Sequence, residues 1–521
     1  QSWRKYTLRY SLPSPSFKYL WWLLFLVVLY YSFSFSKFDV FALVEGFSNS
    51  LALIEEMIPP QFSNLENIIN LTFQTVAIGL WGTIIGSILS LPVGFLSARN
   101  TSPNLLVYYT FRGLVNFLRS IPELLYALIL VIAFGVGPLP GIIALAISTV
   151  GLLGKFYSEA IESVDQKPVE ALQSTGSRSI AVFRHAIIPQ ILPLFVGYNL
   201  YLLDHNIRVA IVLGVVGAGG LGVELYSQMR AFNYPQVGAI LVVIVLVISL
   251  IDRLSAKLRE DIQQYKLLAY HTKTKDLILL ASTIIVALVS LKFLPIDTSE
   301  LVRGFKNLLP LIGEFFKFDF SELKTYVLLM LETVAIGITG TTIAVLLSVP
   351  LGMLMARNLI NNFFVNNVAR EIANFLRAIP ELVMALIFVS AVGLGPFAGV
   401  LAIALHTTGF LSKFYAEAIE NLDYRPIEAL EAVGARLTQT IRHAVIPMIL
   451  PLFNSYNLYI LDRNVRAATV MGVVGAGGIG FELVMRIKLL EFEKVSVMIL
   501  VILLTLVLID YFSGYLRRRL V

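Results

Sequence analysis

The chain has 521 residues, of which 57% are hydrophobic and only 14% are charged, and its mean hydropathy is +0.79. This composition excludes a water-soluble globular protein and predicts a multi-span membrane protein. The net charge is +6 and cysteine is absent, which excludes disulfides, thiolate catalysis and cysteine metal sites. In a membrane protein the positions of Lys and Arg matter more than their sum.

From residue 17 onward the same membrane unit is written twice. Residues 75–79 recur as 333–337, 116–119 as 374–377 and 217–220 as 475–478, always at an offset of 333 − 75 = 258. A register that holds through loops as well as apolar stretches predicts a pseudo-twofold architecture around one central path.

Each copy contains six apolar stretches of roughly the 20 residues that a helix needs to cross the hydrocarbon layer. They lie at 19–36, 70–97, 113–134, 139–155, 188–214 and 236–252, and again at 277–294, 328–355, 371–392, 397–413, 446–472 and 494–510. We therefore expect an all-α integral membrane fold of about 12 transmembrane helices in two repeats, which are parallel because six is even. The expected repeats are residues 1–252 and 276–521, joined by a linker at 253–275.

Lys and Arg gather before the first stretch, after the second and fourth, in the linker and at the C-terminus, whereas loops 135–140 and 217–222 carry none. The positive-inside rule then places the linker and both termini in the cytoplasm. No small-residue cleavage site follows the basic start, so we expect its apolar run to be a retained first span and not a signal peptide. Because residue 1 is Gln, further sequence is expected to precede it. Residues 51–68 and 309–323 mix carboxylates with apolar residues and are expected to form short interfacial outer helices, with a plain loop as the alternative.

The third stretch of each copy contains an Arg-x-Ile-Pro-Glu sequence, with Arg119 and Glu123 in the first copy and Arg377 and Glu381 in the second. Proline frees a carbonyl and bends a membrane helix, which suits a gate or hinge. Pairing of the arginine with the glutamate for stability is an equally acceptable interpretation.

After the fourth stretch, Glu170-Ala171-Leu172 is followed by Gly176 and then by a segment that ends in Pro189. Glu428-Ala429-Leu430, Gly434 and Pro447 repeat this spacing, which predicts a short helix, a glycine turn and a proline that opens the next span. The pattern resembles the Glu-Ala-Ala loop of ABC importer permeases, with Leu172 and Leu430 in place of the usual alanine. In that family the loop is the coupling helix that docks on an ATPase.

The chain contains no GxxxxGK[ST] sequence and so cannot hold ATP phosphates in a P-loop. The resemblance therefore implies two separate ATP-binding subunits that use ATP and Mg, one under Glu170 and one under Glu428. It implies no cofactor or metal bound by this chain.

Charged residues interrupt the fifth stretch of each copy. The first copy carries Asp204, His205, Asn206 and Arg208, and the second carries Asp462, Arg463, Asn464 and Arg466. Charges within spans are costly and usually line a substrate route, so these residues other than His205, with Arg119 and Arg377, are the expected substrate pathway for an anion. The alternative is structural: Asp and Arg at i and i+4 can pair on one helix face and hold the bundle together.

Two further patterns are given little weight. Residues 217–222 match GxGxxG, but a membrane stretch precedes them instead of a strand, so the glycines are expected to permit close helix approach. His406 has Ser148 as its counterpart and no second ligand at metal spacing, so we expect a hydrogen-bonded core residue.

The Asn-Phe-Leu-Arg-x-Ile-Pro-Glu-Leu stretches, Lys-Phe-Tyr-x-Glu-Ala-Ile-Glu at 155 and 413, and the glycine-rich ends of the fifth stretches together resemble the phosphonate ABC importer permeases. The resemblance covers both copies, as two permeases fused in one chain. It implies a type I importer fold in the bacterial inner membrane, an extracytoplasmic substrate-binding protein, and no nucleic acid partner. The substrate would be phosphonate, phosphite or phosphate.

Two other classes of function fit the sequence less well. A secondary transporter with parallel repeats needs unpaired carboxylates near the bilayer midplane, whereas the obvious ones here have arginine neighbours. A membrane enzyme needs a catalytic dyad or a metal cluster, and the sequence supplies neither. We therefore expect a permease that works by alternating access and performs no catalysis itself.

Overall fold

The computed structural model describes residues 15–265, 284–360, 362–423 and 425–520, and within these ranges the chain is helical and contains no strand. The first repeat comprises α1 (Pro15–Phe35), α2 (Val40–Glu56), α3 (Leu65–Ser97), α4 (Leu105–Ser120), α5 (Glu123–Phe134), α6 (Pro138–Glu162), α7 (Gln166–Ser174), α8 (Ser179–Val182), α9 (Ile188–Gly214), α10 (Leu221–Arg230) and α11 (Tyr234–Tyr265). The second comprises α13 (Thr298–Phe315), α14 (Leu323–Met355), α15 (Phe363–Ala378), α16 (Glu381–Val392), α17 (Pro396–Glu420), α18 (Arg425–Ala432), α19 (Leu437–Thr440), α20 (Ile446–Met471), α21 (Ile479–Lys488) and α22 (Phe492–Leu520).

Eight helices of the described chain are long and apolar enough to cross a membrane, or up to ten if each of two bent pairs counts as one span. The first expected span of each copy corresponds to a shorter described apolar helix, at Leu26–Phe35 and Ile284–Phe293. The count of about 12 is therefore reached only when these two are included. Residues 277–283 of one expected span, 266–275 of the expected linker and the basic residues before position 15 lie outside the described residues. The described part of that linker is helical, because α11 continues through Tyr265.

The third expected span of each copy is a bent pair instead of one straight helix. α4 and α5 meet at 85°, and α15 and α16 meet at 86°. The bend lies at Pro122 and Pro380, and the residues before them, Ile121 and Ile379, are extended, because proline disfavours the helical conformation of the residue that precedes it. The predicted proline bend is confirmed.

Small residues let the central helices of each repeat pack closely. A Cβ atom added to Gly86 of α3 would lie 2.5 Å from the Thr149 Cβ of α6, and one added to Gly94 would lie 2.7 Å from the Tyr157 Cβ. In the second repeat, Gly352 of α14 meets Tyr415 of α17 in the same way, at 2.8 Å. This small-residue packing makes α3–α6 and α14–α17 the most extensively paired helices of the two repeats.

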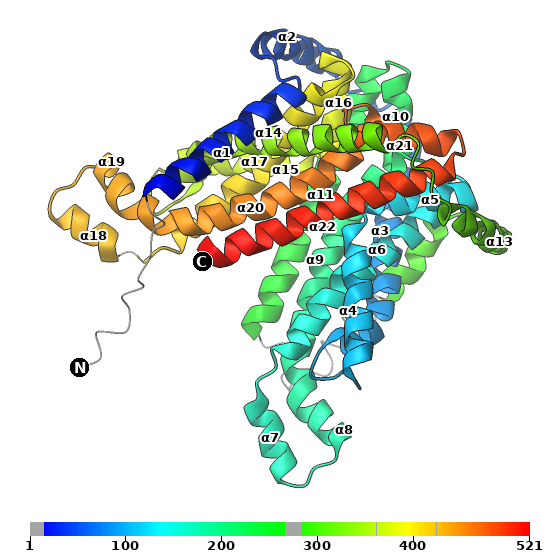
Figure 1. Cartoon of the computed structure of the whole chain (residues 1–521), viewed down its shortest axis with the longest axis horizontal. Helices are drawn as coiled ribbons and strands as arrows, with labels where there is room; N and C mark the ends of the chain where they lie inside the picture. Colours follow the sequence, from blue (N-terminus) through cyan, green and yellow to red (C-terminus); the bar gives the residue numbers. More distant parts are fainter. Residues whose placement is uncertain (1–14, 266–283, 361, 424, 521) are drawn as a thin grey trace.

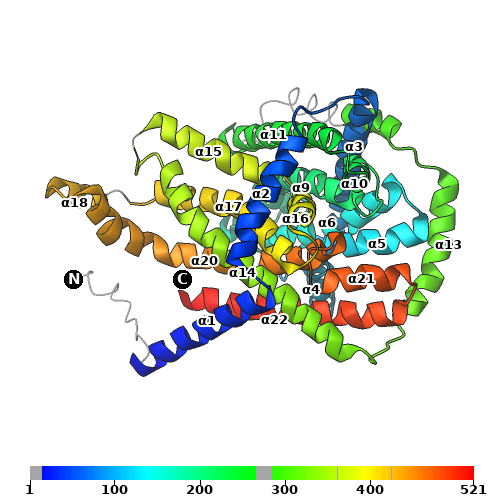
Figure 2. The same ribbon diagram turned by 90° about the horizontal axis from the view of Figure 1, so that it is seen from above.

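The outer helices cross from one repeat to the other. α2 packs on α16, α13 packs on α5 and α1 packs on α14, as Figures 1 and 2 show. Asn49 donates a hydrogen bond to the Ala391 carbonyl at 3.1 Å, and its counterpart Asn307 donates to the Ala133 carbonyl at 3.1 Å. The same contact is thus made twice, and it ties the repeats together at one end of the molecule.

These outer helices begin earlier than expected. They occupy Val40–Glu56 and Thr298–Phe315, so the bounds predicted as 51–68 and 309–323 are wrong, although the elements are helical. Residues 51–68 contain the end of α2, a turn and the start of α3, because Pro59 and Pro60 end the helical segment.

The two repeats diverge like the arms of a V from the end at which α2 and α13 each pack on the other repeat (Figure 1). The α7–α8 hairpin forms the tip of one arm and the α18–α19 hairpin forms the tip of the other. The C-terminal end of α22 lies on the same side of the molecule as these tips. The architecture therefore places the two repeated polar hairpins far apart, at the open ends of the arms.

Candidate functional site at the interface of the two repeats

The charged residues of α9 form ion pairs that reach the other repeat. Arg208 Nη2 lies 3.1 Å from Asp204 Oδ2, as the i,i+4 spacing predicted, and 2.6 Å from Asp252 Oδ1 of α11. Asp252 also pairs with Arg377 of α15, in the second repeat, and Arg208 donates to the Arg377 carbonyl at 3.3 Å. One carboxylate, Asp252, therefore joins an arginine from each repeat.

The second repeat makes the same contacts except for one ion pair, the counterpart of Arg208 with Asp252. Arg466 Nη2 lies 3.1 Å from Asp462 Oδ2, and Arg466 Nη1 donates to the Arg119 carbonyl at 3.0 Å. Arg119 of α4 then pairs with Asp510 of α22 at 3.2 Å. Between the described residues, no ion pair links Arg466 to Asp510. The interface thus has two pseudo-equivalent charge clusters, and the one around Asp252 is the more fully bonded.

Two expectations about the arginines change here. Pairing of Arg119 with Glu123 is wrong, because Arg119 bonds to Asp510, and Arg377 likewise bonds to Asp252 instead of Glu381. Asp252 and Asp510 were missed by the sequence reasoning. The available signal was an aspartate repeated at the last position of the sixth apolar stretch of each copy, at the offset of 510 − 252 = 258.

The two asparagines on the expected pathway do not join these clusters. Asn206 is 1% exposed, and its amide donates to the Thr83 and Thr149 hydroxyls, both at 2.8 Å. Asn464 donates to the Thr341 hydroxyl at 2.8 Å and accepts a hydrogen bond from the Thr407 hydroxyl at 3.0 Å. Each asparagine ties together three helices within its own repeat, because a buried amide must have its hydrogen bonds satisfied.

A third group of polar residues lies where α5 and α16 begin. In the first repeat, Glu123 accepts a hydrogen bond from Ser148 at 3.1 Å, and its Oε1 lies 3.5 Å from His205 Nε2. In the second, the counterpart Glu381 lies 3.4 Å from Arg463 Nη2 and 3.6 Å from His406 Nε2.

His406 is a buried, hydrogen-bonded residue, as expected, and its Nδ1 lies 2.9 Å from the Ile379 carbonyl. The other charged groups of this central cluster, which comprises Glu123, His205, Glu381, His406 and Arg463, keep 26–36% of their side chains exposed. These side chains are therefore only partly buried where α5 and α16 begin.

Both polar hairpins have the geometry that the repeated sequence predicted. Glu170 and Ala171 are exposed on α7, and Val169 is turned inward and buried. Gly176 follows α7 with φ +74° and Gly434 follows α18 with φ +77°, and neither has a neighbour within 4 Å of an added Cβ. These glycines therefore serve the left-handed turn and not close packing. A π turn, Phe183–Ile187, leads into α9, in which Pro189 lies in the first turn.

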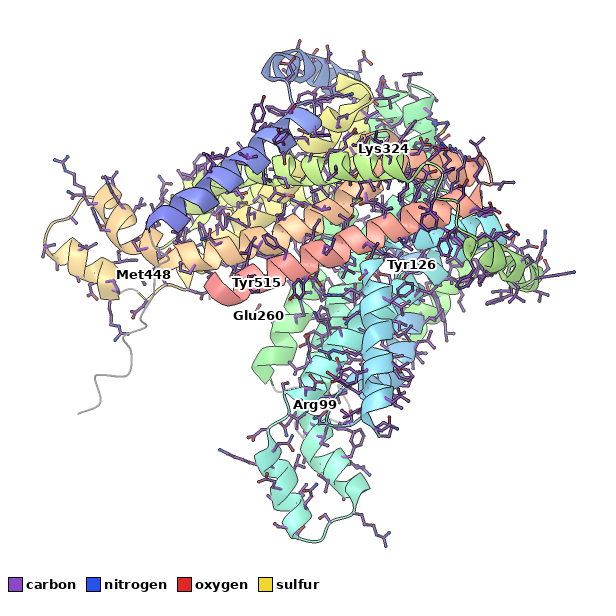
Figure 3. The ribbon with its side chains drawn as sticks, viewed as in Figure 1. Arg99, Tyr126, Glu260, Lys324, Met448 and Tyr515 are labelled. Carbon is purple, nitrogen blue, oxygen red and sulfur yellow. The ribbon has the colours of Figure 1, made fainter. Side chains whose placement is uncertain are left out.

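The glycine-rich segment 217–222 closes the opposite end of α9. Gly217, Gly219 and Gly220 all have positive φ angles, and a Cβ on Gly220 would meet Thr75 Oγ1 at 2.5 Å. Thr75 Oγ1 accepts a hydrogen bond from the Leu221 backbone N–H at 2.8 Å. The expected close approach is confirmed, and it anchors the start of α10 to α3. Side chains near the tips of the two arms can be followed in Figure 3, where Arg99 lies above the α7–α8 hairpin and Met448 lies beside α18.

The model of the family "Binding-protein-dependent transport system inner membrane component" matches residues 90–260 and again residues 348–521. The chain belongs to this family. It is 36% identical over 492 residues to the phosphate-import permease protein PhnE of Mycolicibacterium smegmatis, an alignment that covers 92% of this chain and 91% of the relative.

The permease is also 43% identical over 224 residues to the phosphite transport system permease protein PtxC of Stutzerimonas stutzeri, covering 43% of the permease and 82% of PtxC. Among solved structures, an inward-facing MetNI methionine ABC transporter chain aligns with 36% of the permease and 93% of its own length, at a TM-score of 0.33 and 22% identity.

Membership establishes what kind of protein this is. It is a multi-pass component of the bacterial inner membrane and the permease of an ABC importer, not an enzyme, and ATP hydrolysis belongs to separate ATPase subunits. The two family matches, one in each half of the chain, also confirm that two permease units are fused in one polypeptide.

Proposed function

We propose that the permease carries a small phosphorus oxyanion, namely phosphonate, phosphite or phosphate, into the cell by alternating access. The observation that supports this most directly is the set of arginines at the interface between the repeats, between two arms that end in coupling hairpins. The relatives named for phosphate and phosphite point to the same class of substrate.

Two ATP-binding subunits, which use ATP and Mg, would dock on the hairpins, one on α7 at Glu170 and one on α18 at Glu428. One extracytoplasmic binding protein would deliver the substrate at the end opposite the hairpins, where α2 and α13 each pack on the other repeat. With the hairpins in the cytoplasm, the start of α1 and the C-terminal end of α22 lie there too, in agreement with the distribution of Lys and Arg.

In this mechanism, ATP binding draws the two hairpins together and brings the arms into parallel. The arginine–carboxylate clusters around Asp252 and Asp510 then change partners, because each contains groups from both repeats. We assign Arg208, Arg466, Asp204, Asp462, Arg119 and Arg377 to this gate, and Asn206 and Asn464 to holding each repeat rigid as the gate moves. Hydrolysis of ATP returns the permease to the state in which the arms diverge.

The substrate class is tested by uptake into proteoliposomes that contain the permease, its ATPase subunits and its binding protein. Labelled phosphite, phosphate and methylphosphonate are supplied separately and in competition. We expect ATP-dependent uptake of at least one of them, with the others as competitors. Uptake of none of the three, alongside active ATP hydrolysis, would overturn the proposal.

Coupling is tested with Gly176→Pro and Glu170→Ala. Proline cannot adopt the positive φ of Gly176, so the variant should displace α7 and lower uptake per ATP hydrolysed by about an order of magnitude. Gly197→Ala, in α9 with no neighbour within 4 Å of the added Cβ, is the matched control and should transport normally. Normal coupling in both hairpin variants would show that α7 transmits no force.

A further inference from the structure

The two repeats differ where their central residues meet. The framework around them is conserved between the repeats: Glu123 matches Glu381, and the Asn206–Thr83 bond matches the Asn464–Thr341 bond. Three neighbouring positions do not match. His205, Ser148 and Leu152 of the first repeat correspond to Arg463, His406 and Phe410 of the second. All three changes add a positive, polar or aromatic group on one side of the pseudo-twofold axis.

The three second-repeat residues contact one another. The Arg463 guanidinium carbon lies 4.4 Å from the centre of the Phe410 ring, and Arg463 Nη2 lies 3.3 Å from His406 Nε2. Because His406 Nδ1 faces the Ile379 carbonyl at 2.9 Å and acts as the donor there, its Nε2 is left to accept from Arg463. The stack and this hydrogen bond fix the plane of the guanidinium, while 33% of the Arg463 side chain stays exposed.

Arg463 is only loosely held by its carboxylate. Its distance to Glu381 Oε2 is 3.4 Å, compared with 2.6 Å between Arg208 and Asp252. Both polar contacts of Arg463 use the same nitrogen, Nη2. A planar guanidinium that is oriented, partly exposed and weakly paired can form two parallel hydrogen bonds to an oxyanion. The oxyanion would replace Glu381 as the partner of Arg463, and Glu381 would pair with Arg463 again after release.

The first repeat offers a different set of groups across the axis. His205 Nε2 is buried and has no hydrogen-bond partner, although it lies 3.5 Å from Glu123. Glu123 lies four residues after Arg119, whose carbonyl accepts a hydrogen bond from Arg466 of the other repeat. His205 lies three residues before Arg208, which donates to the Arg377 carbonyl of the other repeat. Both residues are thus brought to the interface between the repeats. The two halves therefore form one site, in which the strongest positive charge lies off the axis, on the second repeat.

We propose that Arg463, with His406 and Phe410 behind it, is the anion-binding half of a single off-axis oxyanion site, and that His205 and Glu123 supply the opposite wall. This inference rests on the proposed function, because it names the place where the transported oxyanion stops between the arms. The bound anion takes Arg463 from Glu381 and lies within reach of the His205 imidazole. Return of Glu381 to Arg463 then favours release, so occupancy is brief.

The test exchanges residues between the repeats and uses the complete complex with its ATPase subunits and binding protein. Arg463→His gives the second repeat the residue of the first. With labelled phosphite and inorganic phosphate as probes, we expect anion transported per ATP to fall at least ten-fold, which corresponds to about 1.4 kcal/mol. Arg463→Lys should be intermediate, because a point charge replaces the two-pronged donor.

The double exchange Arg463→His with His205→Arg is the matched control, because it keeps the composition of the site. It should not restore transport, since His406 and Phe410 remain on the second repeat. Phe410→Leu, which introduces the first-repeat residue, should weaken transport without the loss of a charge.

Full transport by the double exchange would show that the site is symmetric, and unchanged transport by Arg463→His would show that Arg463 binds no substrate. Either result would overturn the inference. Failure of the wild-type complex to import any of the phosphorus oxyanions would instead contradict the proposed function.

Discussion

At the scale of single residues, the most consequential group is the Asp252 carboxylate. It bonds to Arg208 of its own repeat and to Arg377 of the other, and all three side chains are at most 26% exposed. Removing one member of a buried ion pair is costly because the partner charges stay buried without compensation. The equivalent Asp510 is 38% exposed and bonds to one arginine, Arg119.

Asp252→Asn is expected to destabilise the permease by about 3 kcal/mol, because two partly buried guanidinium groups lose the negative charge that they share. The matched variant Asp510→Asn should cost about 1 kcal/mol or less, since its single pair is better solvated. Thermal unfolding midpoints of the two variants in detergent, compared with wild type, measure the difference. Equal losses in the two variants would contradict the greater importance assigned to Asp252.

The charges of the fifth stretch show how far the sequence could predict this site. Spacing alone predicted the Asp204–Arg208 and Asp462–Arg466 pairs, because i,i+4 residues share a helix face. Sequence could not assign Asp252 to Arg377, since these residues are far apart in the chain and meet only when two repeats pack. The contact of Arg463 with Phe410 and His406 was not predicted either, because it forms only when α17 and α20 of the second repeat pack together, although the differences between the copies at all three positions were visible.

At the scale of elements, the outer helices α2 and α13 are the feature that the sequence predicted least well. Their existence was predicted, but their bounds were wrong and their exchange between repeats was not foreseen. Exchange depends on where a helix finds a complementary surface, and here that surface is the end of α5 or α16 in the other repeat. The bends at Pro122 and Pro380, by contrast, followed from the local chemistry of proline.

The exchanged packing makes a prediction about two glycines of α13. A Cβ added to Gly304 would lie 2.0 Å from the Phe134 ring of α5, whereas one added to Gly313 meets nothing within 4 Å. Gly304→Ala should therefore push α13 from α5 and cost about 1–3 kcal/mol of stability. Gly313→Ala should be neutral or should stabilise the helix by up to about 1 kcal/mol. Thermal unfolding midpoints of the two variants, compared with wild type, test this prediction. An unchanged midpoint for Gly304→Ala would argue against the packing of α13 on α5.

At the scale of the whole molecule, the arms should move as two bodies about the end where α2 and α13 each pack on the other repeat. The crossed contacts, such as Asn49 with Ala391 and Asn307 with Ala133, lie at that end, and the hairpins lie at the other. A small rotation of the arms about the end that holds these contacts therefore gives a large displacement of α7 relative to α18.

This motion can be measured because the chain has no native cysteine. Spin labels on Ala171→Cys and Ala429→Cys, two exposed residues of the hairpins, report the separation of the arms. We expect the distance to shorten by several ångströms when the complex with its ATPase subunits binds a non-hydrolysable ATP analogue. Labels at Asn49→Cys and Ala391→Cys should keep their distance. A fixed hairpin distance in every nucleotide state would contradict alternating access.

The reciprocal seating of α2 and α13 has a consequence for ancestry. An interface in which each partner gives and receives the same contact is the kind that two identical chains form, so one ancestral repeat could have assembled with itself. Self-association of that kind forces every position to appear in duplicate. Duplication of the repeat removes the constraint, so residue 205 and residue 463 can diverge while the helices that carry them stay alike.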